Sequence, residues 1–152
     1  MSLDTAAIYN AVVSHALTCG LFERVNGHQP ENAPGNGLTA AVTTAEIGPV
    51  PGESGLMTTT GRLVLNVLIF LPTTYDPPDE IDPVVLGATD ALLTAYSGDF
   101  ELGGQVRNVD LLGQAGTPLS ARAGYTQIDA QTYRVMTITL PLIVNDLWSQ
   151  SP

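Results

Sequence analysis

The stretch of residues 131–144, QTYRVMTITLPLIV, limits the possible folds more than any other part of the sequence. Apolar side chains occupy every second position, which is the pattern of a β-strand with one buried face: Met136, Ile138, Leu140 and Leu142. The intervening positions carry tyrosine, valine and threonine, which favour strands. Such a strand needs a sheet to pair with and a second layer to cover it. Pro141 cannot donate a backbone hydrogen bond, so we expect an edge or a bulge there.

A second stretch, residues 58–71 with the sequence TTTGRLVLNVLIFL, shows the same alternation. One of its faces carries only aliphatic side chains, namely Leu63, Leu65, Val67, Ile69 and Leu71. The other face is polar at first and then apolar, with Leu68 and Phe70. The later half of this strand is therefore predicted to be central and covered on both sides.

Four further segments are weaker strand candidates, namely residues 21–28, 38–47, 105–112 and 121–128. Only Asp129 and Ala130 separate the last of them from the long strand that follows, and so short a link favours a β-hairpin. Segments 29–37 and 48–55 are rich in proline and glycine. They are predicted to be loops, with the composition of mobile segments.

The N-terminal segment has the periodicity of an amphipathic helix. Ile8, Val12 and Ala16 form one apolar row at a spacing of four residues. Ser2 is the expected capping residue, and Gly20 is the expected stop.

A second helix is expected from Asp82, as its N-cap, to Gly98, with Pro83 at the first helical position. Together the elements run helix, strands, helix, strands. This order predicts an α+β fold, a single domain over residues 1–152 with a mostly antiparallel sheet and two main helices on one face.

The charge balance argues against several kinds of partner. The 152 residues contain fifteen acids, five arginines and no lysine, for a net charge of −10. A protein that grips nucleic acid usually has a basic surface, so we expect neither DNA binding nor attachment to an anionic membrane. An acidic surface suits DNA that slides past without sticking. Because the N-terminus lacks the features of a signal peptide and no apolar run reaches membrane-spanning length, we expect a protein made in the cytoplasm.

No motif for catalysis or metal binding stands out. Asp76, Asp79, Glu80 and Asp82 form an acidic run, which we interpret as a solvated turn before a helix rather than a cation site. His15 and Cys19 have ligand spacing, but two ligands do not close a zinc site. We therefore expect no cofactor, no metal and no enzyme activity. The enzyme alternative, a small hydrolase, would require Asp76 or His28 in a cleft.

The arginines are the best candidates for contact residues. Four of them fall within predicted strands, namely Arg62, Arg107, Arg122 and Arg134. Arginine pairs directionally with carboxylates and is enriched at interfaces, although ordinary surface ion pairs are the alternative. Trp148, the only tryptophan, either packs back on the fold or joins an interface. Glu53, in the 48–55 loop, is a further candidate for contact with a neighbouring ring or subunit.

From about Arg62 onward the sequence resembles tail terminator proteins of long-tailed bacteriophages, especially those of actinobacterial hosts. The resemblance lies in GRLVLNVLIFLP, IDPVVLGATDALLTAY, SGDFELGGQVRNVDLLGQAGTPLSARAGYTQID and YRVMTITLPLIVNDLW. These are family-like phrases and not a catalytic signature. The N-terminal helix and first strands fit the same plan, whereas the loops 29–37 and 48–55 match nothing in it.

The resemblance implies a structural virion protein at the junction of tail and neck. Such proteins form a ring, commonly a hexamer, that caps the tail tube, stops its growth and meets the head–tail connector. DNA passes through the lumen without specific binding. The alternatives are a head–tail connector or head-completion protein, and then a tail tube protein, whose rings stack indefinitely.

Overall fold

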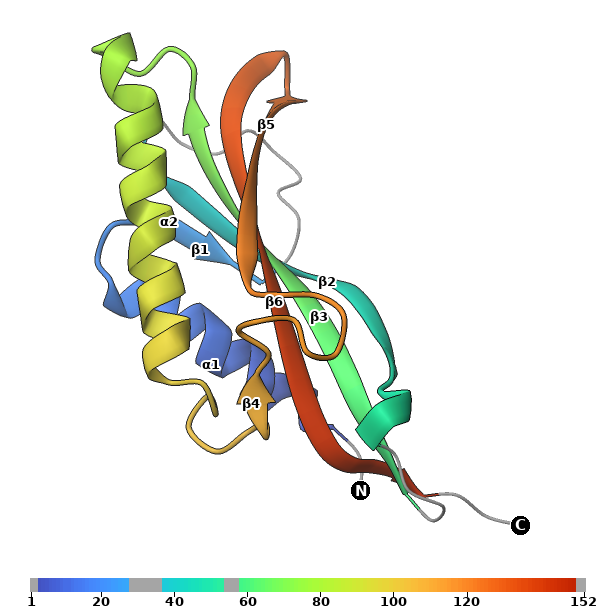
Figure 1. Ribbon diagram of the computed structural model, residues 1–152. Coiled ribbons are helices and arrows are strands. Elements are labelled where there is room, and N and C mark those ends of the chain that lie inside the picture. Colours follow the sequence, from blue (N-terminus) through green and yellow to red (C-terminus); the bar gives the residue numbers. More distant parts are fainter. Residues whose placement is uncertain (1–2, 28–36, 54–57, 150–152) are drawn as a thin grey trace.

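The computed structural model describes residues 3–27, 37–53 and 58–149, over which the chain forms one sheet of six strands and two α-helices (Figure 1). The helices are α1 (Thr5–Thr18) and α2 (Ile81–Gly98). The strands are β1 (Arg24–Asn26), β2 (Thr39–Pro49), β3 (Thr58–Pro72), β4 (Asn108–Val109), β5 (Ser120–Ile128) and β6 (Gln131–Ser149). Short 3₁₀ turns, η1 (Pro51–Glu53) and η2 (Pro78–Glu80), precede β3 and α2. The α+β fold class expected from the sequence is confirmed.

The two strongest strand predictions form the centre of the sheet. β3 and β6 pair antiparallel from Thr58 opposite Ser149 to Pro72 opposite Tyr133. On the far side of β3 lies β2, and β1 adds a short parallel strand to β2. On the far side of β6, β5 pairs with residues 131–139 and β4 with residues 142–143. Among the described strands every pair except β1 with β2 is antiparallel, as expected.

Both helices lie on the same side of the sheet and cover its apolar face (Figure 1). The core joins their buried residues to alternate residues of the central strands: Leu63, Leu65, Val67, Ile69 and Leu71 of β3, and Ile138, Leu140 and Leu142 of β6. This confirms the faces predicted from the alternation. On the opposite face a smaller cluster contains Ala41, Phe70, Tyr133 and Val135. The later half of β3 is thus buried on both faces, because apolar residues occupy consecutive positions there.

A buried hydrogen bond ties the two helices together. Tyr96 of α2 is fully buried, and its hydroxyl donates to the carbonyl of Val12 in α1 at 3.1 Å. Burial raises the pKa of Tyr96 well above its ordinary value, so the hydroxyl keeps its proton. His15 contacts the Tyr96 ring edge-on, with 5.6 Å between the ring centroids.

The helix boundaries correct two predicted caps. The side chain of Asp4, and not Ser2, caps α1 by accepting the backbone N–H of Ala7 at 3.2 Å, while Ser2 lies outside the described residues. Gly20, with φ of 72°, ends the segment as expected. The N-cap of α2 is Glu80 rather than Asp82, because the η2 turn leads straight into the helix.

Two weaker strand predictions were too long. The described part of the first segment, residues 21–27, contributes only β1, and the segment 105–112 contributes only β4. In the second case the chain before β4 is folded into turns, in which Leu102, Gly103 and Gly104 have positive φ. Arg107 consequently precedes β4 and does not lie within a strand.

Pro141 lies inside β6 at the point where that strand changes partner. β5 pairs as far as Thr139, and β4 begins opposite Leu142, so neither strand is paired with Pro141 on this side. The Pro141 carbonyl accepts the backbone N–H of Asp110 at 2.9 Å. The interruption expected at Pro141 is therefore a gap in the pairing of β6, between the end of β5 and the start of β4. The register shift of the ladder lies elsewhere, between Thr59 and Gly61 of β3.

The β5–β6 hairpin turns through the two predicted link residues. Asp129 has φ of 52° and Ala130 has φ of 64°. Left-handed backbone at both positions matches the twist of the flanking strands, but alanine adopts it at a cost that glycine avoids.

Replacing Ala130 with glycine is therefore expected to raise the free energy of unfolding by about 1 kcal/mol. Chemical denaturation followed by circular dichroism measures the change. The matched control, Ala121→Gly, alters an alanine in the extended part of β5 and is expected to lower stability. Equal effects of the two changes would contradict the assignment of strain to Ala130.

Candidate assembly surfaces

β5 forms one edge of the sheet, and half of its backbone groups face away from β6. Ile143 and Pro141 of β6 accept N–H groups from the β4 side, so odd-numbered residues of β6 point toward β4 and β5. They pair with even-numbered residues of β5, such as Thr137 with Arg122. The backbone groups of the odd-numbered residues therefore point outward. Among the described residues no strand receives them: Ala121, Ala123, Tyr125 and Gln127.

The opposite edge of the sheet is also open over much of its length. β1 pairs with β2 only at residues 39–41, and β2 continues past it to Pro49. In the described part of the chain, no strand lies beside the rest of that edge. A bulge between Thr44 and Glu46 reorients the backbone there. Ile47, which is 48% exposed, lies on this open segment.

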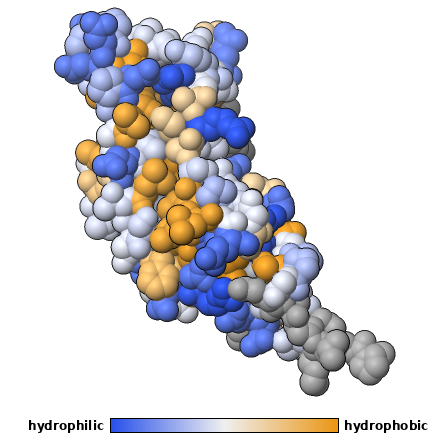
Figure 2. All heavy atoms as spheres, viewed as in Figure 1, coloured by the Kyte–Doolittle hydropathy of each residue, from blue (hydrophilic) through white to orange (hydrophobic). Residues whose placement is uncertain are grey.

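Two apolar regions flank β5. The first, here the loop patch, consists of Phe100, Leu111 and Leu112, and Leu112 is 84% exposed. The second, here the helix trough, is a hollow of about 360 Å³ between α2 and β6 whose apolar lining includes Pro83, Leu86 and Met136. Figure 2 shows apolar side chains gathered over this side of the molecule, between α2 and the hairpin and over the loop before β5.

A buried carboxylate shapes the segment that carries the loop patch. Asp110 is 4% exposed, and its two oxygens accept the backbone N–H groups of Gln114 at 2.9 Å and Ala115 at 2.8 Å. Because these bonds satisfy the carboxylate, the loop closes on itself and presents Leu111 and Leu112 outward.

Two of the candidate arginines are held within the chain. Arg62 donates to Glu46, to the carbonyl of Ala115 and to the hydroxyl of Thr117, which joins β2, β3 and the loop before β5. Arg62 thus makes the directional hydrogen bonds typical of arginine, but with groups of its own subunit.

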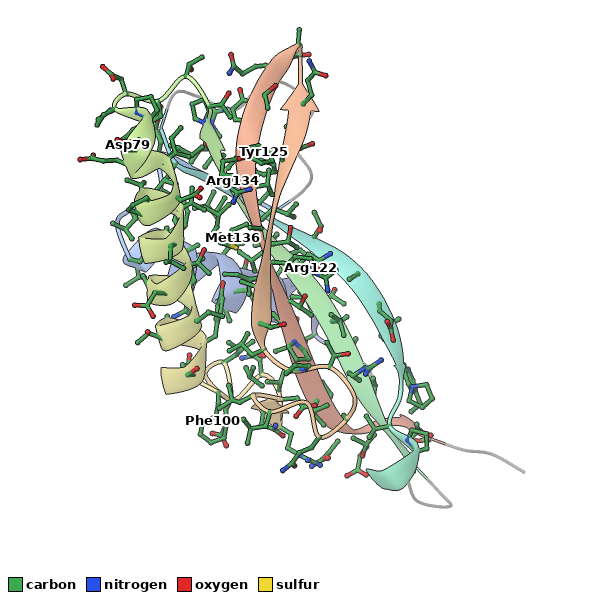
Figure 3. The ribbon with its side chains drawn as sticks, turned by 45° about the horizontal axis from the view of Figure 1, so that its top comes forward. Asp79, Phe100, Arg122, Tyr125, Arg134 and Met136 are labelled. Carbon is green, nitrogen blue, oxygen red and sulfur yellow. The ribbon has the colours of Figure 1, made fainter. Side chains whose placement is uncertain are left out.

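Arg134 is held in the same way between α2 and the hairpin. It donates to Asp82 at 2.9 Å and to the Gly124 carbonyl at 3.2 Å, and its guanidinium lies 4.5 Å from the centre of the Tyr125 ring. Hydrogen bonding to Asp82 raises the pKa of Arg134 above its ordinary value. Figure 3 shows Tyr125, Arg134 and Met136 on the side of the hairpin that faces α2.

The other candidates have different surroundings. Arg107 donates to Asn108 at 2.8 Å and to Asn145 at 3.1 Å. Arg122 is exposed on β5, on the face opposite Tyr125, and has no ion-pair partner among the described residues (Figure 3). Trp148 is 39% exposed, with its ring close to Gly61. The side chain of Glu53 lies outside the described residues.

The groups considered for chemistry are occupied in structural contacts. His15 is hydrogen-bonded to Asp99 at 2.8 Å, and the Cys19 thiol donates to the Ala16 carbonyl at 3.0 Å. In the acidic run, Asp76 precedes the η2 turn, Asp79 and Glu80 lie in that turn, and Asp82 lies in the first turn of α2. All four are exposed, as we interpreted them, and Asp82 also pairs with Arg134. His28 lies outside the described residues. Over residues 3–27, 37–53 and 58–149, no group of three or more histidine, cysteine or acidic residues is placed to hold a metal ion.

Sequence reasoning missed the surfaces that the fold brings together. The helical spacing places Leu86 on the same broad apolar face as Val85 and Leu92, whereas Leu86 is 60% exposed. Leu111 and Leu112 were assigned to a strand. Their position directly after Asp110 and before the glycine-containing segment GQAG was the available sign of a loop.

Comparison with known proteins adds no relative. No protein-family model matches the chain, and a search of curated proteins returns no match. Within the part of the chain that the structure describes, no helix has the length and apolar character needed to cross a bilayer.

The His15–Asp99 contact makes a testable contribution to stability. The backbone N–H of Gly103 and then the hydrogen bond to His15 hold the pKa of Asp99 below its ordinary value of 3.8. A lowered carboxylate pKa stabilises the fold at pH values above the unfolded pKa, and this contribution is lost as pH falls through the folded value. We therefore expect wild type to exceed Asp99→Asn in stability near pH 6, with the difference shrinking below about pH 4.

Urea denaturation of both proteins between pH 6 and pH 2 measures that difference. A difference that stays constant across this range would show that the carboxylate charge does not stabilise the turn.

Replacement of Asp110 tests the loop. Asp110→Ala leaves the N–H groups of Gln114 and Ala115 without their acceptor, so we expect a loss of about 1–3 kcal/mol in the free energy of unfolding. Asp110→Asn keeps one acceptor oxygen and should lose less. Equal stability of the alanine variant and wild type, measured by thermal denaturation, would contradict this role.

Proposed function

We propose that this chain is a structural virion protein that forms a ring on the end of the tail tube of a long-tailed bacteriophage. The ring ends tube polymerisation and provides the joint to the neck. Its partners are copies of itself, in a hexamer, together with the major tail tube protein and the head–tail connector. The observation that carries the proposal is the pair of open edges on opposite sides of one sheet.

Open edges on opposite sides favour head-to-tail assembly. When two different surfaces of identical subunits meet, each end of the growing chain of subunits still presents one unused surface. Subunits therefore add until the chain closes into a ring. Exposed strand edges are usually blocked in monomers by charge, proline or a covering loop. Here β5 carries only Arg122 as a charge between Ser120 and Ile128, and the apolar helix trough and loop patch lie beside it.

The distribution of charge suits a ring that DNA passes through. The net charge is −10, and Arg62 and Arg134 are paired within the chain. Little positive charge is therefore left to hold phosphate groups, and like charges keep the duplex from sticking. The sequence resemblance to tail terminators agrees with this arrangement, and the structural contacts of His15 and Cys19 agree with a non-enzymatic role.

Deleting the gene from the phage that carries it tests the proposal. We expect electron microscopy to show tails of uncontrolled length and few joined heads, because nothing stops tube growth. Supplying the purified protein should restore tubes of fixed length with an added ring at one end. As a control, the same preparation with an unrelated protein of similar charge should not restore them.

The location of the ring separates the proposal from its alternatives. Gold-labelled protein at the head-proximal end of isolated tails supports a terminator. Label on tailless heads would instead indicate a connector or head-completion protein. Label along the whole tube would indicate a tube protein, and either result would overturn the terminator assignment.

A further inference from the structure

We propose that the outer edge of β5 pairs, antiparallel, with the open part of β2 in a second copy of this chain, so that one sheet continues from subunit to subunit. This inference deepens the proposed function and rests on the ring being made of identical copies. It assigns the two surfaces that meet. Ile47 of one copy lies opposite Ala123 of the next, and Glu46 lies diagonally across from Arg122 on the other face of the sheet.

Backbone geometry supports the pairing. β5 offers outward N–H and C=O groups at alternate residues from Ala121 to Gln127, and β2 runs on beyond β1 to Pro49, with the bulge between Thr44 and Glu46 turning the backbone groups of Ile47 outward. Three successive antiparallel pairings separate β2 from β5 within one subunit, so these two strands run in opposite directions. If neighbouring copies are related by a rotation axis parallel to the strands, each strand keeps its direction from one copy to the next. β5 of one copy and β2 of the next are then antiparallel.

Side chains on the helix side of the sheet are complementary in size. Ala123 is paired with Met136, whose side chain faces the helices, so Ala123 lies on that side of β5. Ile47 is paired with Leu63, another core residue, and lies on the same side of β2. Continuing the sheet sets the exposed isoleucine against a small alanine and next to the helix trough, where its apolar surface leaves water.

Charges on the other side of the sheet are complementary as well. Arg122 is paired with Thr137 and is exposed without an ion-pair partner among the described residues. Glu46 is paired with Val64 on the same face of the sheet, and its side chain is 58% exposed although it also binds Arg62. One junction therefore matches an apolar contact on the helix side with an opposite-charge contact on the other side.

Hydrogen exchange of backbone amides tests the pairing directly. Mass spectrometry is applied to dilute protein and to protein concentrated to its solubility limit, with sedimentation velocity reporting the assembly state. We expect the outward amides of Ala121, Ala123, Tyr125 and Gln127 to exchange quickly in the monomer and at least tenfold more slowly in the assembled form. The outward amide of Ile47, beyond the bulge in β2, should slow in parallel, because both edges become paired at once.

Two variants address the two edges separately. Ala123→Pro removes an outward N–H and leaves the ladder to β6 intact, since a proline is tolerated on a free strand edge. It is expected to weaken association at least tenfold, whereas Ala123→Ser, which keeps the N–H, is not. On the other edge, Ile47→Glu should weaken association to a similar extent, while Thr94→Glu, an exposed position on α2 outside both surfaces, should not. Circular dichroism confirms that each variant is folded.

The outcomes separate this inference from the proposed function. Protein that stays monomeric up to its solubility limit, or an assembly whose β5 amides exchange at the monomer rate, overturns the edge pairing. If protein without edge pairing still caps tail tubes, the terminator function is supported and only the edge pairing is overturned. Edge-paired assemblies that never bind tube ends would instead support the pairing and overturn the function.

Discussion

The antiparallel pairing of β3 with β6 is the interaction on which the rest of this structure depends. The two strands pair from Thr58 opposite Ser149 to Pro72 opposite Tyr133, and alternate side chains of both build the core beneath the helices. Because strand periodicity fixes which residues face α1 and α2, a slip of one residue would expose the whole apolar set. Every other strand is attached to this pair, directly or through β2.

A sheet built outward from a central pair ends in edges, and no strand among residues 3–27, 37–53 and 58–149 covers the outer side of β5 or the end of β2. Helices cover one face, but they do not close the ladder of backbone groups at β5 or at the end of β2. A monomer must leave such groups to water or to a partner. The apolar surface beside β5, at Leu86 and Leu112, favours a protein partner over water.

Sequence reasoning predicted the parts of the fold that rest on long periodic patterns. β3, β6, both helices, the hairpin link at Asp129 and the single-sided helix layer all followed from alternation and spacing. Local detail followed less well. The cap of α1 shifted to Asp4, and segment 105–112 shrank to β4 because turns with positive φ at Leu102 and Gly103 occupy the chain before it.

The candidate site was harder to predict than the fold, since it depends on contacts between distant segments. The arginines were singled out as residues for contacts between subunits, whereas Arg62 and Arg134 pair within the chain, with Glu46 and Asp82. No spacing rule indicates whether an arginine meets a carboxylate of its own subunit or of another. Exposure of Leu112 likewise depends on the loop that Asp110 closes.

The carbonyl of Pro141 and the backbone N–H of Asp110 join that loop to the middle of β6. Asp110 thus connects the loop to the sheet through its backbone N–H and closes the loop through its carboxylate. The leucines beside it are consequently held ready in position before any neighbour arrives. The backbone around these leucines loses little conformational freedom on contact. The loop patch is therefore a preorganised contact surface rather than a segment that must fold upon binding.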